Sequence, residues 1–200
     1  MRSSFVTALL ALGAVSLAAP RPDSNLPAPL DDAKCMTREE ADFLIDVYAK
    51  VIEQFDRDLL KKYLSDDFFD TSDSINTFIH KPLGGPTFAT KAIFIEKQEV
   101  GAHFPIEILS VDAVTCDTVA LQWKSTFGAA NLPSKGITIM KMGFEDAIWK
   151  IRSIEVEFNA LTWLLNMGGS YTWEDVTYTP ENIDPALVAK PSTTTPTRTT

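Results

Sequence analysis

Residues 148–158 are IWKIRSIEVEF, a stretch in which apolar and polar residues alternate as in a half-buried β-strand. Trp149 and Ile151 share one phase of the alternation, but the apolar residues that follow Ser153 have the other phase. One extra residue near Arg152 and Ser153, a β-bulge, would restore a single buried face, and bulges bend sheets sharply. The stretch therefore predicts the last strand of a strongly curved sheet.

Other elements of the same sheet precede this strand. Period-two patterns predict strands at 104–114, 119–127 and 135–142. Before them, apolar residues recur every three or four positions over about 37–54, which predicts a helix there, and further helices are expected at about 56–64, 74–80 and 90–100. Thr37 followed by Glu40 is the signature of a capping box at the start of the first helix. Helices first and strands later indicate an α+β fold with the helices packed on a curved antiparallel sheet.

Length and charge limit the classes of function. The chain has 200 residues, of which 45% are hydrophobic, enough for one domain with a substantial core. The formal net charge is −9. This charge argues against nucleic acid as a partner, which requires clustered Lys and Arg, and against an anionic membrane surface.

The two ends of the chain differ from the middle. Residues 1–18 combine Arg2, an apolar stretch and a small-residue cleavage pattern that ends at Ala18, which predicts a signal peptide and an extracellular, secreted protein. Residues 19–33 are a proline-rich linker. The domain is expected at 34–170. Residues 171–200 are expected to form an irregular tail that is rich in Ser, Thr and Pro at its end.

Only two cysteines are present, Cys35 and Cys116. An even count in a secreted protein makes one disulfide the simplest prediction, and it would tie the start of the first helix to a hairpin of the sheet. Two unpaired buried thiols are the alternative.

Several motifs together resemble a group of secreted fungal proteins in the nuclear transport factor 2-like superfamily. They are Cys35-Met36-Thr37, LSDDFFDTSDSIN (64–76), GGPTFATKAIFIEKQ (84–98), VTCDTVALQWKSTFG (114–128), KGITIM (135–140) and WKIRSIEVEFNALTWLLNMGG (149–169). The resemblance implies a cone fold with a helix-lined conical pocket over the concave face of the sheet, a fungal origin, and no assigned reaction.

Fold analogy does not choose a function, since this superfamily contains both enzymes and binding modules. Three hypotheses follow. The first is a protein that binds a small apolar or aromatic molecule in its pocket. The second is an isomerase, cyclase or dehydratase with a carboxylate general base. The third is an interaction protein that forms a homodimer through the convex face of the sheet. None of them requires a cofactor.

The most chemically suggestive stretch is DDFFDTSDSIN, residues 66–76. Its spacing does not fit an EF-hand calcium loop, which needs a Glu at its twelfth position. As a catalytic site, Asp70 or Asp73 beside aromatic residues could have a raised pKa and accept a proton. The structural alternative is a turn in which Asp73 or Ser74 caps a helix that begins around Ile75.

Two further sets of residues are candidates. Glu155, Glu157 and Asn159 alternate on one face of the last strand, so that Glu157 could pair with Asp70 inside the cone; alternatively, these three face solvent. The candidates for the ligand pocket are aromatic side chains that could equally belong to the core. They are Trp123, Phe127, Phe158 and Trp163. No pair of His or Cys has the spacing of a metal site, so no metal is predicted.

Overall fold

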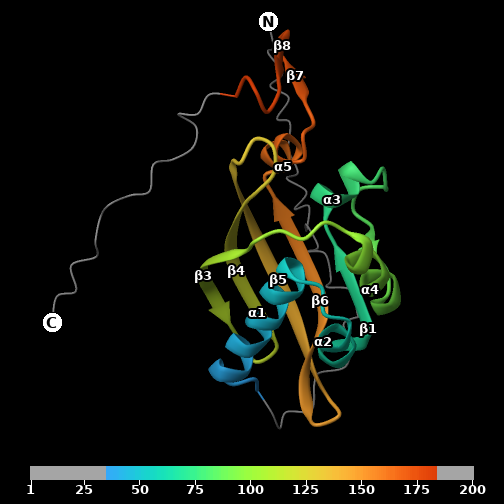
Figure 1. Ribbon diagram of the computed structural model, residues 1–200. Helices are drawn as coiled ribbons and strands as arrows, with labels where there is room; N and C mark the ends of the chain where they lie inside the picture. Colours follow the sequence, from blue (N-terminus) through green and yellow to red (C-terminus); the bar gives the residue numbers. More distant parts are fainter. Residues whose placement is uncertain (1–34, 184–200) are drawn as a thin grey trace, which may run out of the picture. The chain divides into compact units, whose positions relative to one another are not determined.

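The computed structural model of the protein describes residues 35–183 (Figure 1). The predicted signal peptide, the linker and the end of the C-terminal tail lie outside the described residues. Within them, the helices are α1 (Arg38–Glu53), α2 (Arg57–Tyr63), α3 (Asp73–Phe78), α4 (Lys91–Val100) and α5 (Ala160–Asn166). None of these helices is long and apolar enough to span a membrane.

Within residues 35–183, six strands form the main sheet, in the spatial order β2-β1-β6-β5-β4-β3. Their bounds are β1 (Leu64–Thr71), β2 (Pro86–Phe88), β3 (Glu107–Val114), β4 (Thr118–Thr126), β5 (Pro133–Glu145) and β6 (Ile148–Phe158). Two more strands, β7 (Tyr171–Trp173) and β8 (Val176–Tyr178), pair as a separate hairpin. The sequence predicts an irregular tail from residue 171, but its first eight residues form this hairpin.

The first helix begins as its sequence predicts. Thr37 is the N-cap, its Oγ1 accepts a hydrogen bond from the backbone N–H of Glu40 at 3.2 Å, and the Glu40 carboxylate accepts one from the Thr37 N–H at 2.8 Å. The capping box is therefore confirmed. It satisfies two of the amide groups that the first turn of a helix leaves without partners.

The sheet is mixed, which corrects the expectation of a purely antiparallel sheet. Strand β1 runs parallel to β6, while the other neighbouring pairs are antiparallel. The strands of the pairs β3–β4, β4–β5 and β5–β6 follow one another in sequence, and short turns between them make the pairs antiparallel. Strands β1 and β6 are separated by a long stretch of chain, and such a connection is compatible with parallel pairing. Most of DDFFDTSDSIN is consequently strand rather than turn, since β1 continues to Thr71.

The bulge in the last strand is confirmed at Arg152. Lys141 pairs with Ser153 and Met142 pairs with Ile151, so that Arg152 is the extra residue without a partner in β5. Its guanidinium forms an ion pair with the carboxylate of Asp67 on β1. The bulge therefore lies where three strands of the sheet are connected.

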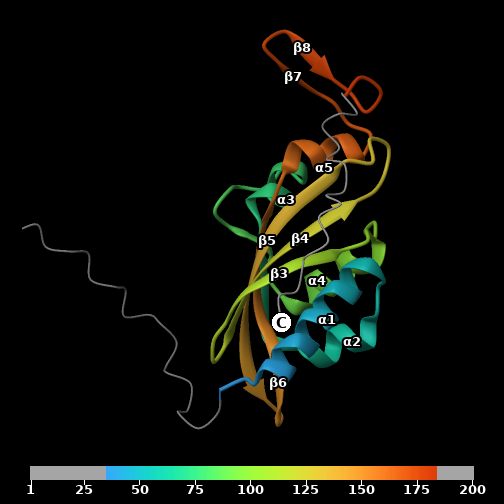
Figure 2. The same ribbon diagram turned by 90° about the vertical axis from the view of Figure 1, so that its left-hand side faces the viewer.

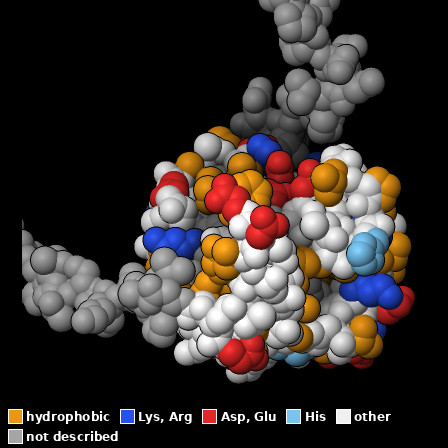
Figure 3. Space-filling model, turned by 90° about the horizontal axis from the view of Figure 1, so that it is seen from above, with side chains coloured by type: hydrophobic (Ala, Val, Ile, Leu, Met, Phe, Trp, Pro, Cys, Tyr) orange, Lys and Arg blue, Asp and Glu red, His pale blue; other side chains and the backbone are white. Residues whose placement is uncertain are grey.

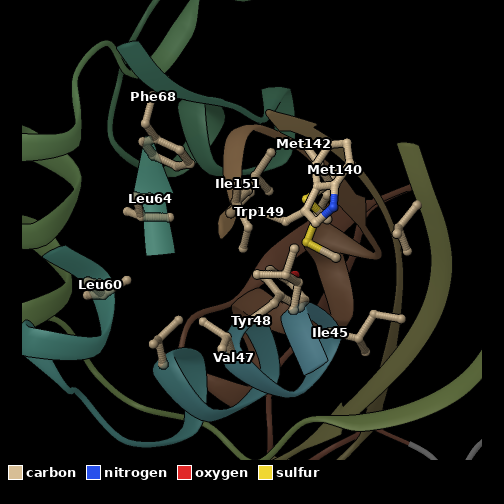
Figure 4. Packing of buried hydrophobic residues seen from close by; sticks show 14 of the residues in the cluster. Ile45, Val47, Tyr48, Leu60, Leu64, Phe68, Met140, Met142, Trp149 and Ile151 are labelled. Carbon is tan, nitrogen blue, oxygen red and sulfur yellow. The ribbon is translucent and has the colours of Figure 1, made fainter. Parts of the chain in front are cut away.

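Helices α1, α2 and α4 cover one face of the curved sheet, and α3 and α5 lie toward one end of it (Figures 1 and 2). The core fills the space between the two layers. Figure 4 shows Tyr48 on α1 pointing toward Met140 and Trp149 of the sheet, with Leu64 and Phe68 of β1 beside them. We refer to this helix-covered side as the concave face.

The predicted disulfide between Cys35 and Cys116 is present. It joins the residues just before α1 to the turn between β3 and β4, and a hydrogen bond from the Met36 N–H to the Cys116 carbonyl, 3.0 Å, lies beside it. The crosslink closes a segment with a sequence separation of 81 residues. In the chain-entropy account, a loop of this length stabilises a fold by roughly 4–5 kcal/mol.

Candidate functional site

The concave face contains a buried carboxylate. Along β1, Phe68 and Asp70 point toward the helices, while Phe69 between them is 44% exposed. Asp70 is only 2% exposed, and its Oδ1 atom has no hydrogen-bond partner among residues 35–183. A buried carboxylate without a full set of partners is costly to the folded state, and such groups occur preferentially where function requires them.

The surroundings of Asp70 favour its neutral form. Burial raises its pKa to about 7, the negative charge of Glu157 also raises it, and the positive charge of Lys81 opposes these effects. The Lys81 ammonium donates to the carbonyl of Thr87 and lies 5.7 Å from the centroid of the Phe88 ring, and Phe88 is the residue that pairs with Asp70 across β1 and β2. A carboxyl group with a pKa near 7 can accept and return a proton at neutral pH.

Three more polar side chains on the concave side, Trp123, Thr138 and Tyr48, are joined by hydrogen bonds. The indole Nε1–H of Trp123 donates to Thr138 Oγ1 at 2.9 Å, and the Tyr48 hydroxyl is also 2.9 Å from Thr138 Oγ1. Burial raises the pKa of Tyr48, and the negative charge of Asp70 adds to this effect, so that the phenol stays protonated. If Thr138 donates to Tyr48, the phenol proton is available to another acceptor.

The strand register brings these groups near Asp70. Asp70 pairs with Ile154 on β6, and Thr138 of β5 pairs with Val156, the next residue of β6 on the same face. Asp70 and Thr138 therefore lie on adjacent rungs of the concave face, with Tyr48 of α1 above them. We call Asp70, Tyr48, Thr138 and Trp123 the polar row.

All four aromatic residues predicted to line a pocket come together at one end of the polar row. Trp163 lies 4.6 Å from Phe127, 4.7 Å from Phe158 and 6.2 Å from Trp123, measured between ring centroids. Phe104 joins them, 4.1 Å from Phe127. Trp123 is buried, whereas the other four are partly exposed. We call these five side chains the aromatic cluster.

Local structure positions Trp163 of α5 over the strands. The Asn159 side chain caps α5 by accepting a hydrogen bond from the Thr162 N–H at 3.1 Å. At the other end of the helix, the Asn166 carbonyl accepts from Ala129 N–H, and a Cβ on Gly128 would lie 1.9 Å from the same oxygen. Gly128 also has φ +69°, a conformation that favours glycine, so this residue lets the turn after β4 approach α5 closely.

The other two acidic candidates have structural roles. Glu157 faces away from the core, and its carboxylate accepts hydrogen bonds from the backbone N–H groups of Asp73, at 2.5 Å, and Ser74, at 2.9 Å, at the start of α3. Asp73 accepts from the Gly84 N–H at 2.7 Å. The N-cap of α3 is Ser72 rather than the expected Asp73 or Ser74, because the helix begins earlier, at Asp73.

Sequence reasoning placed Asp70 and Trp123 among the candidates, but not Tyr48 or Thr138. Tyr48 belongs to the apolar stripe of a helix, a pattern that indicates core. Thr138 carried a detectable signal, because it is a polar residue in the buried phase of β5, between Gly136 and Met140. Glu155 is exposed, as expected for the outer face of β6. Among residues 35–183, no group of three or more His, Cys, Asp or Glu is arranged to hold a metal ion.

Helices over the concave face of a strongly bent sheet, with a bulged last strand and polar groups inside, define an α+β cone fold. The chain belongs to the NTF2-like domain family, because the sequence model of that family matches residues 34–170. The predicted fold class is confirmed, with the correction that the sheet is mixed. A comparison with curated proteins gave no match.

Solved structures with a similar fold include two bacterial proteins of unknown function. An NTF2-like protein from Silicibacter pomeroyi is 17% identical, with a TM-score of 0.41 over 62% of this chain and 100% of the other. A SnoaL-like protein from Burkholderia thailandensis is 13% identical, with a TM-score of 0.48 over 63% of this chain and 99% of the other. Similarity at this level carries no argument about activity.

Replacing Asp70 by Asn will change how stability depends on pH. In the wild type, the pKa of Asp70 rises from its ordinary value of 3.8 to about 7 on folding, so the stability present at low pH is lost as the pH rises from about 4 through 7. The neutral Asn avoids this loss. We expect Asp70→Asn to be more stable than the wild type at pH 8, by up to about 4 kcal/mol, and the advantage to shrink toward pH 4.

Chemical denaturation of both proteins from pH 4 to pH 8 measures this difference. Asp67→Asn is the matched control, because Asp67 is an ion-paired carboxylate on the same strand whose pKa is lowered by Arg152. That variant should lose stability at pH 8 instead. An Asp70→Asn variant whose stability relative to the wild type does not change with pH would contradict the assignment of a raised pKa.

Proposed function

We propose that this domain binds a small aromatic or apolar molecule on the concave face, against the aromatic cluster. The observation that supports this most directly is that partly exposed aromatic rings from separate segments of the chain meet in the cluster. Phe104, Phe127, Phe158 and Trp163 come from four different segments, meet at one end of the sheet, and remain partly exposed. Ligand sites of this type combine apolar and aromatic walls with a few convergent polar groups.

The polar row supports an orientation for such a molecule. Its apolar part would contact the rings of the aromatic cluster, and one polar group would face Tyr48 and Asp70. Tyr48 can donate a hydrogen bond when Thr138 donates to the Tyr48 oxygen, and Asp70 has an oxygen that lacks a partner in the described chain. Figure 3 views the end of the molecule that carries α3 and α5, where hydrophobic and acidic side chains both reach the surface.

Substituting Trp163 by Ala should weaken binding of a neutral aromatic probe. With N-phenyl-1-naphthylamine, whose fluorescence rises in apolar surroundings, we expect the dissociation constant to increase about tenfold, because the loss of a large aromatic contact is worth on the order of 1–2 kcal/mol. Trp173→Ala is the matched control, since Trp173 lies in the separate hairpin and is 66% exposed. Equal effects of the two variants, or none, would reject the proposed site.

A second candidate function is catalysis by proton transfer, as in an isomerase, cyclase or dehydratase. It is favoured by one observation, the unpartnered Oδ1 of Asp70 together with a pKa of about 7. In this scheme the Asp70 carboxylate removes a proton from a carbon next to a carbonyl group of the substrate, and Tyr48 donates a hydrogen bond to the oxygen that gains negative charge. Asp70 then returns the proton to another position.

Deuterium exchange tests this scheme even when the product is unidentified. Small molecules extracted from the native protein are incubated with it in deuterated buffer, and deuterium uptake at carbon is followed by mass spectrometry. Uptake should increase as the pH rises through about 7, as Asp70 becomes charged, and should be lost in Asp70→Asn. Exchange that persists in Asp70→Asn would exclude Asp70 as the base.

The interaction hypothesis has support on the opposite side of the sheet. Ile137, which is 55% exposed, and Ile139, also exposed, are neighbours on this convex face of β5, while Phe69 is exposed on β1, with β6 between the two strands. Exposed apolar side chains that lie together are typical of association surfaces. We propose a homodimer through this face as the alternative to ligand binding alone.

Secretion is likewise a proposal. It is supported by the signal-like residues 1–18 and by the disulfide, and the motif resemblance supports a fungal source. Native and denaturing mass spectra of protein from its own culture medium test secretion and association together. We expect a denatured chain that begins at Ala19 and a native dimer; an uncleaved chain would reject the signal peptide, and a native monomer would reject the dimer.

A further inference from the structure

A cavity lies apart from the polar row and the aromatic cluster. It has a volume of about 490 Å³ and is lined by α2, by the beginning of β1 and by the beginning of α4. No residue of the polar row or the aromatic cluster contributes to its lining. The volume lies within the range of sites for small molecules.

The charged lining of this cavity is mostly positive. It includes Arg57, Lys61 and Lys91 but only one carboxylate, Asp66. Lys91 Nζ lies 3.0 Å from Asp66 Oδ1, and Arg57 pairs with Glu99. Lys61 has no ion pair within residues 35–183. With Lys91 and Arg57 each paired to a carboxylate, Lys61 leaves a net positive charge here, in a chain whose formal net charge is −9.

The remaining lining is suited to an apolar group. Ala92 and Ile95 are three residues apart on α4, so they share one face of the helix and form an apolar floor. Thr90 is the N-cap of α4, and its Oγ1 accepts from the Ile93 N–H at 3.3 Å. The first turn of α4 therefore borders the cavity, and its backbone N–H groups add partial positive charge to that of the side chains.

We propose that this cavity binds a small organic acid, with its apolar part on Ala92 and Ile95 and its anionic group near Lys61 and Arg57. A cationic rim attracts a carboxylate or sulfonate from solution, and an apolar floor contributes by excluding water. Because Lys61 has no ion pair in the described chain, it gains one without losing another. The ligand chemistry differs from that of the concave face, where Asp70 presents an unpartnered carboxyl oxygen that, once charged, would repel an anion.

The test compares two probes that share an aromatic body. 8-Anilinonaphthalene-1-sulfonate carries a sulfonate, and N-phenyl-1-naphthylamine lacks it. In fluorescence titrations of the full chain, Lys61→Glu should weaken binding of the sulfonate probe about three- to tenfold, since reversal of an exposed charge removes one attraction and adds a repulsion. High salt should also weaken binding of the sulfonate probe, because it screens the attraction between charges. The affinity for the neutral probe should change neither with Lys61→Glu nor with high salt.

Lys62→Glu is the matched control, because Lys62 is an exposed neighbour on α2 that does not line the cavity. It changes the net charge equally and should leave the affinity for the sulfonate probe nearly unchanged. Ala92→Trp, at an exposed position, should fill the cavity and abolish that binding. Trp163→Ala should leave binding of the sulfonate probe unchanged, and this result would distinguish the cavity from the proposed ligand site on the concave face.

Amide chemical shifts of the wild type give a result that does not depend on any variant. Addition of the sulfonate probe should shift resonances of residues 57–61 and 90–95. The proposal is overturned if the shifts map elsewhere, if Lys61→Glu and Ala92→Trp both bind the sulfonate probe like the wild type, or if Lys62→Glu weakens binding as much as Lys61→Glu.

Discussion

The bulge at Arg152 is the constraint on which the concave face depends. It allows side chains before it, such as Ile151, and after it, such as Ile154, to face the same helices. Gly143 on the neighbouring strand makes room, since a Cβ there would lie 2.5 Å from the Arg152 side chain. The ion pair with Asp67 then connects the bulge to β1. A sheet bent in this way can enclose side chains that a flat sheet would leave open to solvent.

The carboxylate of Asp70 is one of the side chains that the bent sheet encloses. Its neighbours do not neutralise it fully, because Glu157 adds negative charge from one side while Lys81 offers positive charge from another. Glu157 is itself held by the amide groups at the start of α3. The interaction that anchors this short helix thereby helps to set the protonation of Asp70. Structural and chemical roles are linked here through one outward-facing side chain.

The two proposed sites select opposite kinds of ligand. On the concave face, aromatic rings and an unpartnered carboxylate oxygen favour a neutral molecule that can donate a hydrogen bond or a proton. In the cavity lined by α2 and α4, cationic side chains favour an anion. The two sites are built from different residues, with no side chain in common, so that one acidic domain can contain both.

Features that depend on neighbouring residues can be predicted from the sequence. The capping box at Thr37, the phase change in 148–158 and the single possible cysteine pair each follow from local spacing or from counting. The aromatic residues of the pocket prediction also come together, although their function stays a prediction. Features that depend on distant partners emerge only when the chain is folded: β1 pairs in parallel with β6, Asp70 is buried, and Glu157 caps a helix. A polar strand segment such as DDFFDT is indistinguishable from a loop until its partners are known, because burial and pKa are properties of the surroundings and not of the residue.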